Sequence, residues 1–193
     1  YGITNAARER LQPPNAEHLF GTDGYGRDIF ARVVHGSRVS LMIGLSTTIF
    51  SLVVGGLLGA AAGYYGGKVD DIIMRACDIV MSIPGILLAL AIIAALGAST
   101  MNLLIAITIS SVPGSVRLVR STILTVVEQD FIEAARSYGS SDMRIIVKYI
   151  LPNAVGPIIV NTTMSIASMI LSAAGLSFIG MGIQPPQPEW GAM

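Results

Sequence analysis

The residues best placed to do chemistry in this 193-residue chain form a polar segment, Glu133-Ala-Ala-Arg-Ser-Tyr-Gly139, followed after nine residues by Tyr149-Ile-Leu-Pro152. A carboxylate beside small side chains can form a charged contact while the surface of another protein comes close. The segment lies between two long runs without charge, so it is a polar island in an apolar chain. This pattern favours a docking surface for a partner.

Elsewhere the sequence has few residues that are suited to catalysis or to binding a metal. An enzyme acting at membrane depth would need a nucleophile with a base, or paired carboxylates. His18 and His35 precede the first apolar run, and Asp78 stands alone. No group of His, Cys or carboxylates suggests a metal site, and residues 21–26 lack the Gly-Lys-Ser/Thr ending of a phosphate-binding loop. We therefore expect no catalytic, metal-binding or cofactor-binding residues in this chain.

The composition predicts a membrane protein. Hydrophobic residues make up 52% of the chain and charged residues only 12%, about half the share of an ordinary soluble domain. Asp, Glu, Lys and Arg are absent from 39–67, 79–116 and 151–188. Because a bilayer core needs about 20 apolar helical residues per crossing, we predict an all-α, polytopic membrane helix bundle. The expected spans lie near 40–63, 77–96, 103–119 and 154–181.

The basic residues predict how these spans are oriented. Lys and Arg occur between the first two spans and between the last two, whereas 97–102 and the segment after 181 hold none. By the positive-inside rule the basic loops face the cytoplasm. The loop 128–152 is therefore expected there, with the segments 1–39 and 183–193 outside. A zero net charge gives no reason to expect nucleic acid.

The arginines before the first span oppose this orientation. Five of them precede residue 39, on the side where the rule disfavours positive charge. Apolar residues recur at helical spacing from 27 to 41, with charged residues between them. We therefore predict an amphipathic helix that lies flat in the membrane interface, in contact with lipid.

Small and polar side chains within the spans predict packing and pathway positions. Gly55, Gly59 and Gly63 repeat every four residues, so one helical face permits close approach of another helix. A contact within the subunit and a contact across a subunit boundary both fit this pattern. Asn161 and Ser165 lie at membrane depth, where a polar side chain either lines a pathway or bonds to a neighbouring helix.

The polar island itself predicts two short amphipathic helices. The first covers 128–138 and ends at Gly139, a residue suited to the position after a C-cap. The second begins at Ser140 or Ser141 and continues until Pro152 interrupts it. From these residues alone, a cap on the membrane surface and a docking site for a partner are equally acceptable.

The spacing of the island resembles the signature loop of the permease subunits of ATP-binding-cassette importers. That loop has Glu-Ala-Ala, three residues, Gly, nine residues, and then a bulky residue two positions before Leu-Pro. Tyr149 stands where the family usually has isoleucine, and its ring can still pack. The resemblance implies that the following residues couple the chain to an ATPase: Glu133, Ala134, Ala135, Gly139, Tyr149, Leu151 and Pro152.

Further segments narrow the resemblance. The stretches 20–28, 36–41, 63–67 and 176–182, with Gln184-Pro-Pro and Trp190-Gly-Ala, are similar to the second of two permease chains in dipeptide, oligopeptide and nickel uptake systems. The resemblance implies the type I importer permease fold, with 40–182 as the transmembrane core. It also implies a multi-pass protein of the bacterial plasma (inner) membrane. Family members have a span before and after this stretch, so the four spans are expected to be the middle of six.

The resemblance implies a permease subunit of an ATP-driven importer for peptides or a related small solute. It would form the pathway with a homologous permease subunit and receive substrate from an external substrate-binding protein. Cytoplasmic ATPase subunits would hold the ATP and Mg²⁺, so this chain would not be an enzyme. A channel or structural membrane helix bundle without ATPase coupling is the alternative.

Overall fold

The computed structural model describes residues 9–183 and 187–192, and this part of the chain contains helices but no regular strand. The prediction of an all-α membrane bundle is confirmed. The elements, in chain order, are α1 (Ile29–Tyr65), α2 (Gly67–Met81), α3 (Gly85–Leu96), α4 (Thr100–Val127), α5 (Asp130–Ser137), α6 (Asp142–Ile145), the π-helical turn η2 (Ile146–Ile150), α7 (Leu151–Phe178) and the 3₁₀ turn η3 (Trp190–Ala192).

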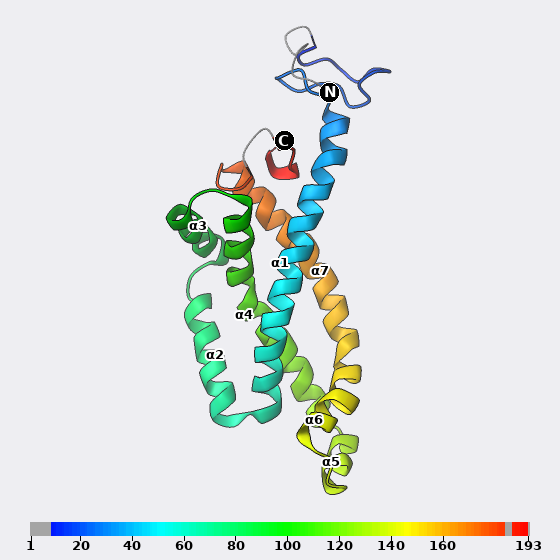
Figure 1. Cartoon of the computed structure of the whole chain (residues 1–193), viewed down its shortest axis with the longest axis vertical. Coiled ribbons are helices and arrows are strands. Elements are labelled where there is room, and N and C mark those ends of the chain that lie inside the picture. The colour runs from blue at the N-terminus through cyan, green and yellow to red at the C-terminus, as the bar shows by residue number, and fades with distance from the viewer. Residues whose placement is uncertain (1–8, 184–186, 193) are drawn as a thin grey trace.

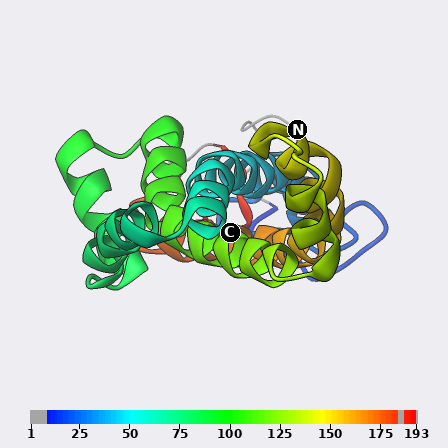
Figure 2. The ribbon, with the colours of Figure 1, turned by 90° about the horizontal axis from the view of Figure 1, so that it is seen from below.

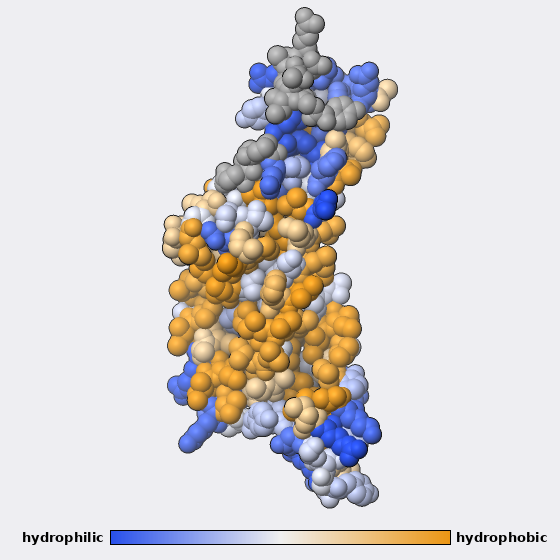
Figure 3. Space-filling model, viewed as in Figure 1, coloured by the Kyte–Doolittle hydropathy of each residue, from blue (hydrophilic) through white to orange (hydrophobic). Residues whose placement is uncertain are grey.

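The bundle is elongated, and α1, α4 and α7 run along its length (Figure 1). Among the described residues, three helices are long and apolar enough to cross a membrane: 29–65, 100–127 and 142–178. The space-filling view shows a broad apolar belt with hydrophilic residues at both ends (Figure 3). The two chain ends lie at one end of the bundle, and α5 and α6 lie at the other (Figure 1). The polar island and the two terminal segments therefore occupy opposite ends, as the expected orientation requires.

The first helix is longer than the sequence predicts. It runs without interruption from Ile29 to Tyr65, so the separate interfacial helix expected over 27–41 is wrong. Neither a proline nor a residue with positive φ occurs in this helix. Because nothing breaks the backbone hydrogen bonds, the amphipathic stretch forms the first turns of α1 and lies in line with the rest of the helix (Figure 1).

The predicted span at 77–96 is not one continuous helix. The chain breaks between α2 and α3, and the two helices are bent by 77° relative to each other. Pro84 is the N-cap of α3 and has no N–H to donate, and it disfavours helical backbone at the residue before it. Pro113 and Pro157 lie inside α4 and α7.

The other predicted spans fall within long helices, with different ends. The stretch 40–63 lies inside α1, and 103–119 lies inside α4. The stretch 154–181 extends three residues past the end of α7 at Phe178. The chain leaves the helix there because Gly180 has a φ of 79°, which helical backbone does not allow.

Two apolar clusters hold the long helices together. Seen from below, α2 and α3 lie on one side of α1 and α4, while α5, α6 and the start of α7 lie on the other (Figure 2). The upper cluster buries Ile43, Ala89, Ile93, Leu103, Ala106, Ile107, Ala173, Leu176 and Ile183. The lower cluster buries Val119, Ile123, Val126, Ile132, Ala135, Ile145, Ile150 and Ala154. The lower cluster therefore fixes the polar island to the long helices.

Two ion pairs join α2 to α4. Arg120 meets both carboxylate oxygens of Asp70, and Arg117 lies 2.6 Å from Asp78. Asp78, which stands alone in the sequence pattern, gains its partner from another helix. The reason is tertiary packing: α4 runs beside α2 and presents its arginines to the acidic residues of that helix.

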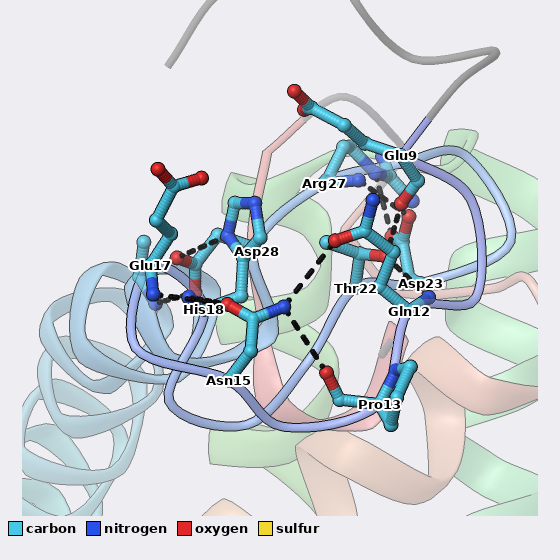
Figure 4. A network of polar contacts seen from close by, with 11 residues as sticks. Glu9, Gln12, Pro13, Asn15, Glu17, His18, Thr22, Asp23, Arg27 and Asp28 are labelled. Atoms are coloured by element: carbon cyan, nitrogen blue, oxygen red, sulfur yellow. Dashed lines mark hydrogen bonds and ion pairs between the residues drawn. The ribbon is translucent and has the colours of Figure 1, made fainter.

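The segment before α1 is held by polar contacts (Figure 4). The side-chain oxygen of Asn15 accepts hydrogen bonds from the backbone N–H groups of Glu17 and His18. His18 Nδ1 lies 3.0 Å from Asp28, which also accepts from the N–H of Ala31 at the start of α1. These two contacts lower the pKa of Asp28, the backbone N–H having the larger effect.

Parts of both predicted terminal segments lie outside the described residues. These parts are 1–8 of the segment 1–39, and 184–186 and 193 of the segment 183–193. The stretch Gln184-Pro-Pro, which contributed to the resemblance, is among them.

Candidate functional site

The polar island folds into a compact projection at the lower end of the bundle, made of α5, α6 and η2 (Figure 1). One side of α5 is anchored, because Ile132 is fully buried and Ala135 nearly so in the lower cluster. Glu133 and Ala134 are exposed. The helix thus exposes a carboxylate and a small side chain on its outer side. Its inner side is fixed, because moving α5 away from the long helices would break apolar contacts.

Gly139 forms the elbow between the two short helices. Its φ is +74°, in the left-handed region that residues with a Cβ rarely adopt. A Cβ on Gly139 would meet no atom within 4 Å, so the requirement for glycine here is conformational and not steric. Its N–H bonds to the carbonyl of Arg136, and the next N–H, of Ser140, bonds to Ala135. This glycine therefore sets the angle at which α6 leaves α5.

The second short helix is tied to the end of α1. The hydroxyl of Tyr64 donates a 2.6 Å hydrogen bond to Asp142, in the first turn of α6. The guanidinium of Arg136 lies over the Tyr64 ring, 5.7 Å from its centre. Tyr64 thereby links α1 with both short helices. It was not predicted, because it lies at the end of α1, far from the island in sequence, and the spacing of the island residues does not point to it.

Pro152 does not interrupt the second helix, contrary to the prediction. The chain continues from Asp142 to Phe178 as one long helical segment. The helix accommodates Pro152 because the preceding turn, η2, is π-helical. In this turn the N–H of Leu151 bonds to the carbonyl of Ile146. A wider turn relieves the clash between the proline ring and the preceding turn. The amide of Asn153 donates to the carbonyl of Tyr149 at 2.7 Å.

The remaining residues of the expected coupling set lie on this turn. Tyr149 is partly buried against the lower cluster, as a bulky residue in place of isoleucine can be. Leu151 and Pro152 are exposed. Because η2 and α7 form one helical segment, the structure joins the polar island rigidly to a long membrane helix.

Two exposed residues extend the outward surface of the projection beyond that set. Tyr138 is 90% exposed and Met143 is 70% exposed. Tyr138 is the C-cap residue, where the helix ends before Gly139. The projection thus combines a carboxylate with exposed aromatic and thioether side chains, a surface suited to binding a protein.

A groove with several hydroxyl side chains in a mainly apolar wall lies between the two apolar clusters. Two adjoining cavities of about 190 Å³ and 250 Å³ share Ser110, Ser111 and Met169. The smaller is lined in part by the start of α3 after the break. The larger is lined by α1, α4 and α7, with Met81 at the end of α2. The larger, here called the hydroxyl cavity, has these polar side chains in its wall: Thr48, Ser51, Ser110, Ser111, Ser115, Thr162 and Ser165.

The two residues expected to line a pathway differ in position. Ser165 lines the hydroxyl cavity. Asn161 is not among the lining residues, and its amide donates to the carbonyl of Pro157 one turn earlier. The hydroxyls of α1 and α4 were missed, because isolated serines and threonines in apolar helices carry no pattern that distinguishes a cavity from a helix contact.

The glycines of α1 pack within this chain. A Cβ on Gly55 would lie 2.5 Å from the side chain of Ser115. On Gly59 it would lie 2.5 Å from the carbonyl oxygen of Val116, and on Gly63 it would lie 2.9 Å from Ile123. All three therefore let the α1 backbone approach α4, which leaves no space there for a helix from another subunit.

Comparison with known proteins agrees with this geometry. Residues 55–193 match the profile of a family described as the binding-protein-dependent transport system inner membrane component. That match covers more than half of the chain. The chain belongs to this family.

Curated relatives of this inner membrane component are permease proteins. The chain is 50% identical over its whole length to the dipeptide transport system permease protein DppC of Alkalihalophilus pseudofirmus, and covers 63% of that protein. It is 51% identical over 180 residues to the glutathione transport system permease protein GsiD of Escherichia coli, with 93% of this chain and 59% of the relative covered. The chain thus spans about three fifths of these relatives.

The fold of this inner membrane component is that of a type I importer permease. A chain of the MetNI methionine ABC transporter, in an inward-facing structure, superimposes with a TM-score of 0.69 and 22% identity. The superposition covers 80% of this chain and 77% of that chain. The expected fold class is therefore confirmed, and the family match confirms the expected location in the inner membrane.

Proposed function

We propose that this chain is part of the permease subunit of an ATP-driven importer for peptides or a related small solute. The single observation that carries the proposal is the placement of Glu133. It is exposed on a projection that is anchored to the lower cluster and continuous with α7. Identity of about half with dipeptide and glutathione permeases supports a peptide-like substrate.

The projection is proposed to couple movement of an ATPase to the membrane helices. Cytoplasmic ATPase subunits, with ATP and Mg²⁺ bound to them, would dock against Glu133, Ala134 and the exposed residues near the Gly139 elbow. When those subunits close, a rigidly attached projection moves α7 as one body, because η2 and α7 share a continuous helix. The energy of hydrolysis would thus reach the pathway without any chemistry in this chain.

The pathway itself is assigned to the groove between the two clusters. A homologous permease subunit would complete it, and an external substrate-binding protein would deliver solute at the end of the bundle that holds the chain termini. The break between α2 and α3 opens on the same groove, since Gly85 and Ile86 line its smaller cavity. Broken helices at a membrane pathway are a recurring feature of transporters.

Charge reversal at the projection tests the proposal. The full permease with its ATPase is purified in detergent, either unaltered or carrying Glu133→Arg. Loss of the co-purified ATPase and of ATP-dependent uptake is expected, because a charged contact at a protein interface becomes repulsive. Glu128→Arg is the matched control, since Glu128 is also exposed and ends α4 on the same side.

A channel or a structural bundle remains the alternative to exclude. It would purify without an ATPase, and Glu133→Arg would leave its properties unchanged. Ion conductance in planar bilayers without ATP would identify a channel, and an importer is expected to show none.

A further inference from the structure

Helix α2 is attached to the bundle differently from the long helices. It lies at one edge of the bundle, beside α4 (Figure 2). Among the described residues, neither apolar cluster includes a member of α2, and the partly buried residues that pack against the clusters come from other elements. Cys77 is the one buried residue of this helix. Apolar packing therefore does little to hold α2 in place.

Ion pairs with α4 hold this helix instead. Arg120 meets both carboxylate oxygens of Asp70, and the two side chains are 29% and 17% exposed. The pair of Arg117 with Asp78 is more open, with side chains that are 44% and 60% exposed. A contact of arginine with two oxygens is directional, and a partly sheltered pair is stronger than an exposed one. The Asp70–Arg120 pair is therefore the main attachment of α2 to α4.

Both ends of α2 are breaks in the helical backbone. Gly66 has a φ of 63° and a ψ of −159°, a conformation that is open almost only to glycine, and Gly67 also has a positive φ. At the other end, residues 82–84 separate α2 from α3, and the two helices are bent by 77°. A helix between two such breaks can swing as a rigid rod while only a few backbone angles change.

The last turn of α2 borders the groove. Met81, its last residue, is part of the wall of the hydroxyl cavity, together with Ser111 and Leu118 of α4. Gly85, the first residue of α3, lines the adjoining smaller cavity. Movement of α2 away from α4 would withdraw Met81 from the cavity wall. The groove would then be open on the side of α2, while both apolar clusters stay packed.

The arginine of the main pair lies on the helix that leads to the projection. Helix α4 ends at Val127 and α5 begins at Asp130, so a short connection joins them. Ile123 of α4 and Ile132 of α5 are buried in the same lower cluster. The lower part of α4 therefore moves with the projection. The arginine side of the pair follows the projection, whereas the carboxylate side follows α2.

We propose that α2 is a hinged gate on the groove and that the Asp70–Arg120 pair is its latch. Movement of the projection shifts Arg120 relative to Asp70, the pair separates, and α2 swings on the breaks at its two ends. Both charges are partly exposed in the closed gate, so they regain water at small cost when they part. This inference rests on the proposed transport function and adds the part of this chain that moves.

The thiol of Cys77 reports the position of α2. It is buried while the gate is closed, and it is the one cysteine of this chain. The complete transporter with its ATPase is purified in detergent and treated briefly with N-ethylmaleimide. Mass spectrometry then gives the labelled fraction of the peptide that carries Cys77, so cysteines of other subunits do not interfere.

Without nucleotide, Asp70→Asn is expected to label about three- to tenfold faster at Cys77 than the unaltered protein, the range for a charged pair that is partly exposed. Asp71→Asn is the matched control, because Asp71 is an exposed acid next in sequence, and it should label at the unaltered rate. Exchange of the pair, Asp70→Arg with Arg120→Asp, should restore slow labelling. If Asp70→Asn does not assemble, Arg120→Lys makes the same test, because it keeps the charge and loses the two-oxygen contact.

Trapping the unaltered transporter with ATP and vanadate should also accelerate the labelling of Cys77. Equal rates in Asp70→Asn and Asp71→Asn would overturn the latch, and a rate that trapping leaves unchanged would overturn the gate. Absence of ATP-dependent uptake in the unaltered transporter would instead refute the proposed function. The comparison without nucleotide is independent of uptake, so it still decides whether the Asp70–Arg120 pair holds α2.

Discussion

The hydroxyl of Tyr64 and the carboxylate of Asp142 are joined by a 2.6 Å hydrogen bond that spans 78 residues of sequence. It connects the last turn of α1 with the first turn of α6. The projection is therefore tied to α1 through this bond and to α7 through η2. A surface fixed at two points transmits a displacement, whereas a surface on a single flexible arm would absorb it.

Tyr64→Phe is expected to loosen this projection without unfolding the bundle. The substitution removes a hydrogen bond to a charged acceptor, worth about 1–2 kcal/mol at a partly exposed site, but it keeps the ring in the lower cluster. Hydrogen exchange of the amides in 130–150 should become faster by about tenfold. Tyr65→Phe is the control, because that neighbouring ring is 62% exposed. Equal exchange in both variants would show that the bond holds nothing.

Gly59→Ala is expected to destabilise the contact between α1 and α4. The new Cβ would lie 2.5 Å from the carbonyl oxygen of Val116, a backbone atom that cannot turn aside. Separating two packed helices by even a small distance costs about 1–3 kcal/mol. Gly56→Ala, one turn away, provides the matched control, since a Cβ there would meet nothing within 4 Å. Thermal unfolding in detergent should show a lower Tm for the first variant only.

Gly139→Ala tests the elbow of the projection. A residue with a Cβ at a φ of +74° costs about 1–2 kcal/mol, and no steric clash accompanies it. We expect ATPase coupling to fall because the angle between α5 and α6 changes, while the complex still assembles. Gly175→Ala serves as control in a helical position with open space, where alanine is neutral or stabilising. A coupling efficiency that falls equally in both variants would exclude a specific role for the elbow.

The sequence predicted features that depend on local patterns. Charge-free runs located the long helices, and the spacing around Gly139 located the elbow. It failed where neighbours in space decide the outcome. Pro84 breaks a helix whereas Pro152 does not, because a π turn absorbs the second proline. Asp78 pairs with Arg117 on another helix and not with a residue on its own. The hydroxyl cavity likewise exists only once α1, α2, α4 and α7 are packed together.

The end of the bundle that holds the segment before α1 has its own predicted dependence on pH. The backbone N–H of Ala31 and, next, His18 hold the pKa of Asp28 below its usual value. A carboxyl whose folded pKa is depressed stabilises the fold above its unfolded pKa of about 3.9, and this contribution disappears as the pH falls through the folded pKa. Below about pH 4, proteolysis of the segment 9–28 should therefore accelerate. In Asp28→Asn the rate should be higher at neutral pH and should change less on acidification. Glu17→Gln, which alters an exposed acid in the same segment, should follow the unaltered protein. If Asp28→Asn keeps the full acid dependence, then groups other than this N-cap carboxylate control the segment.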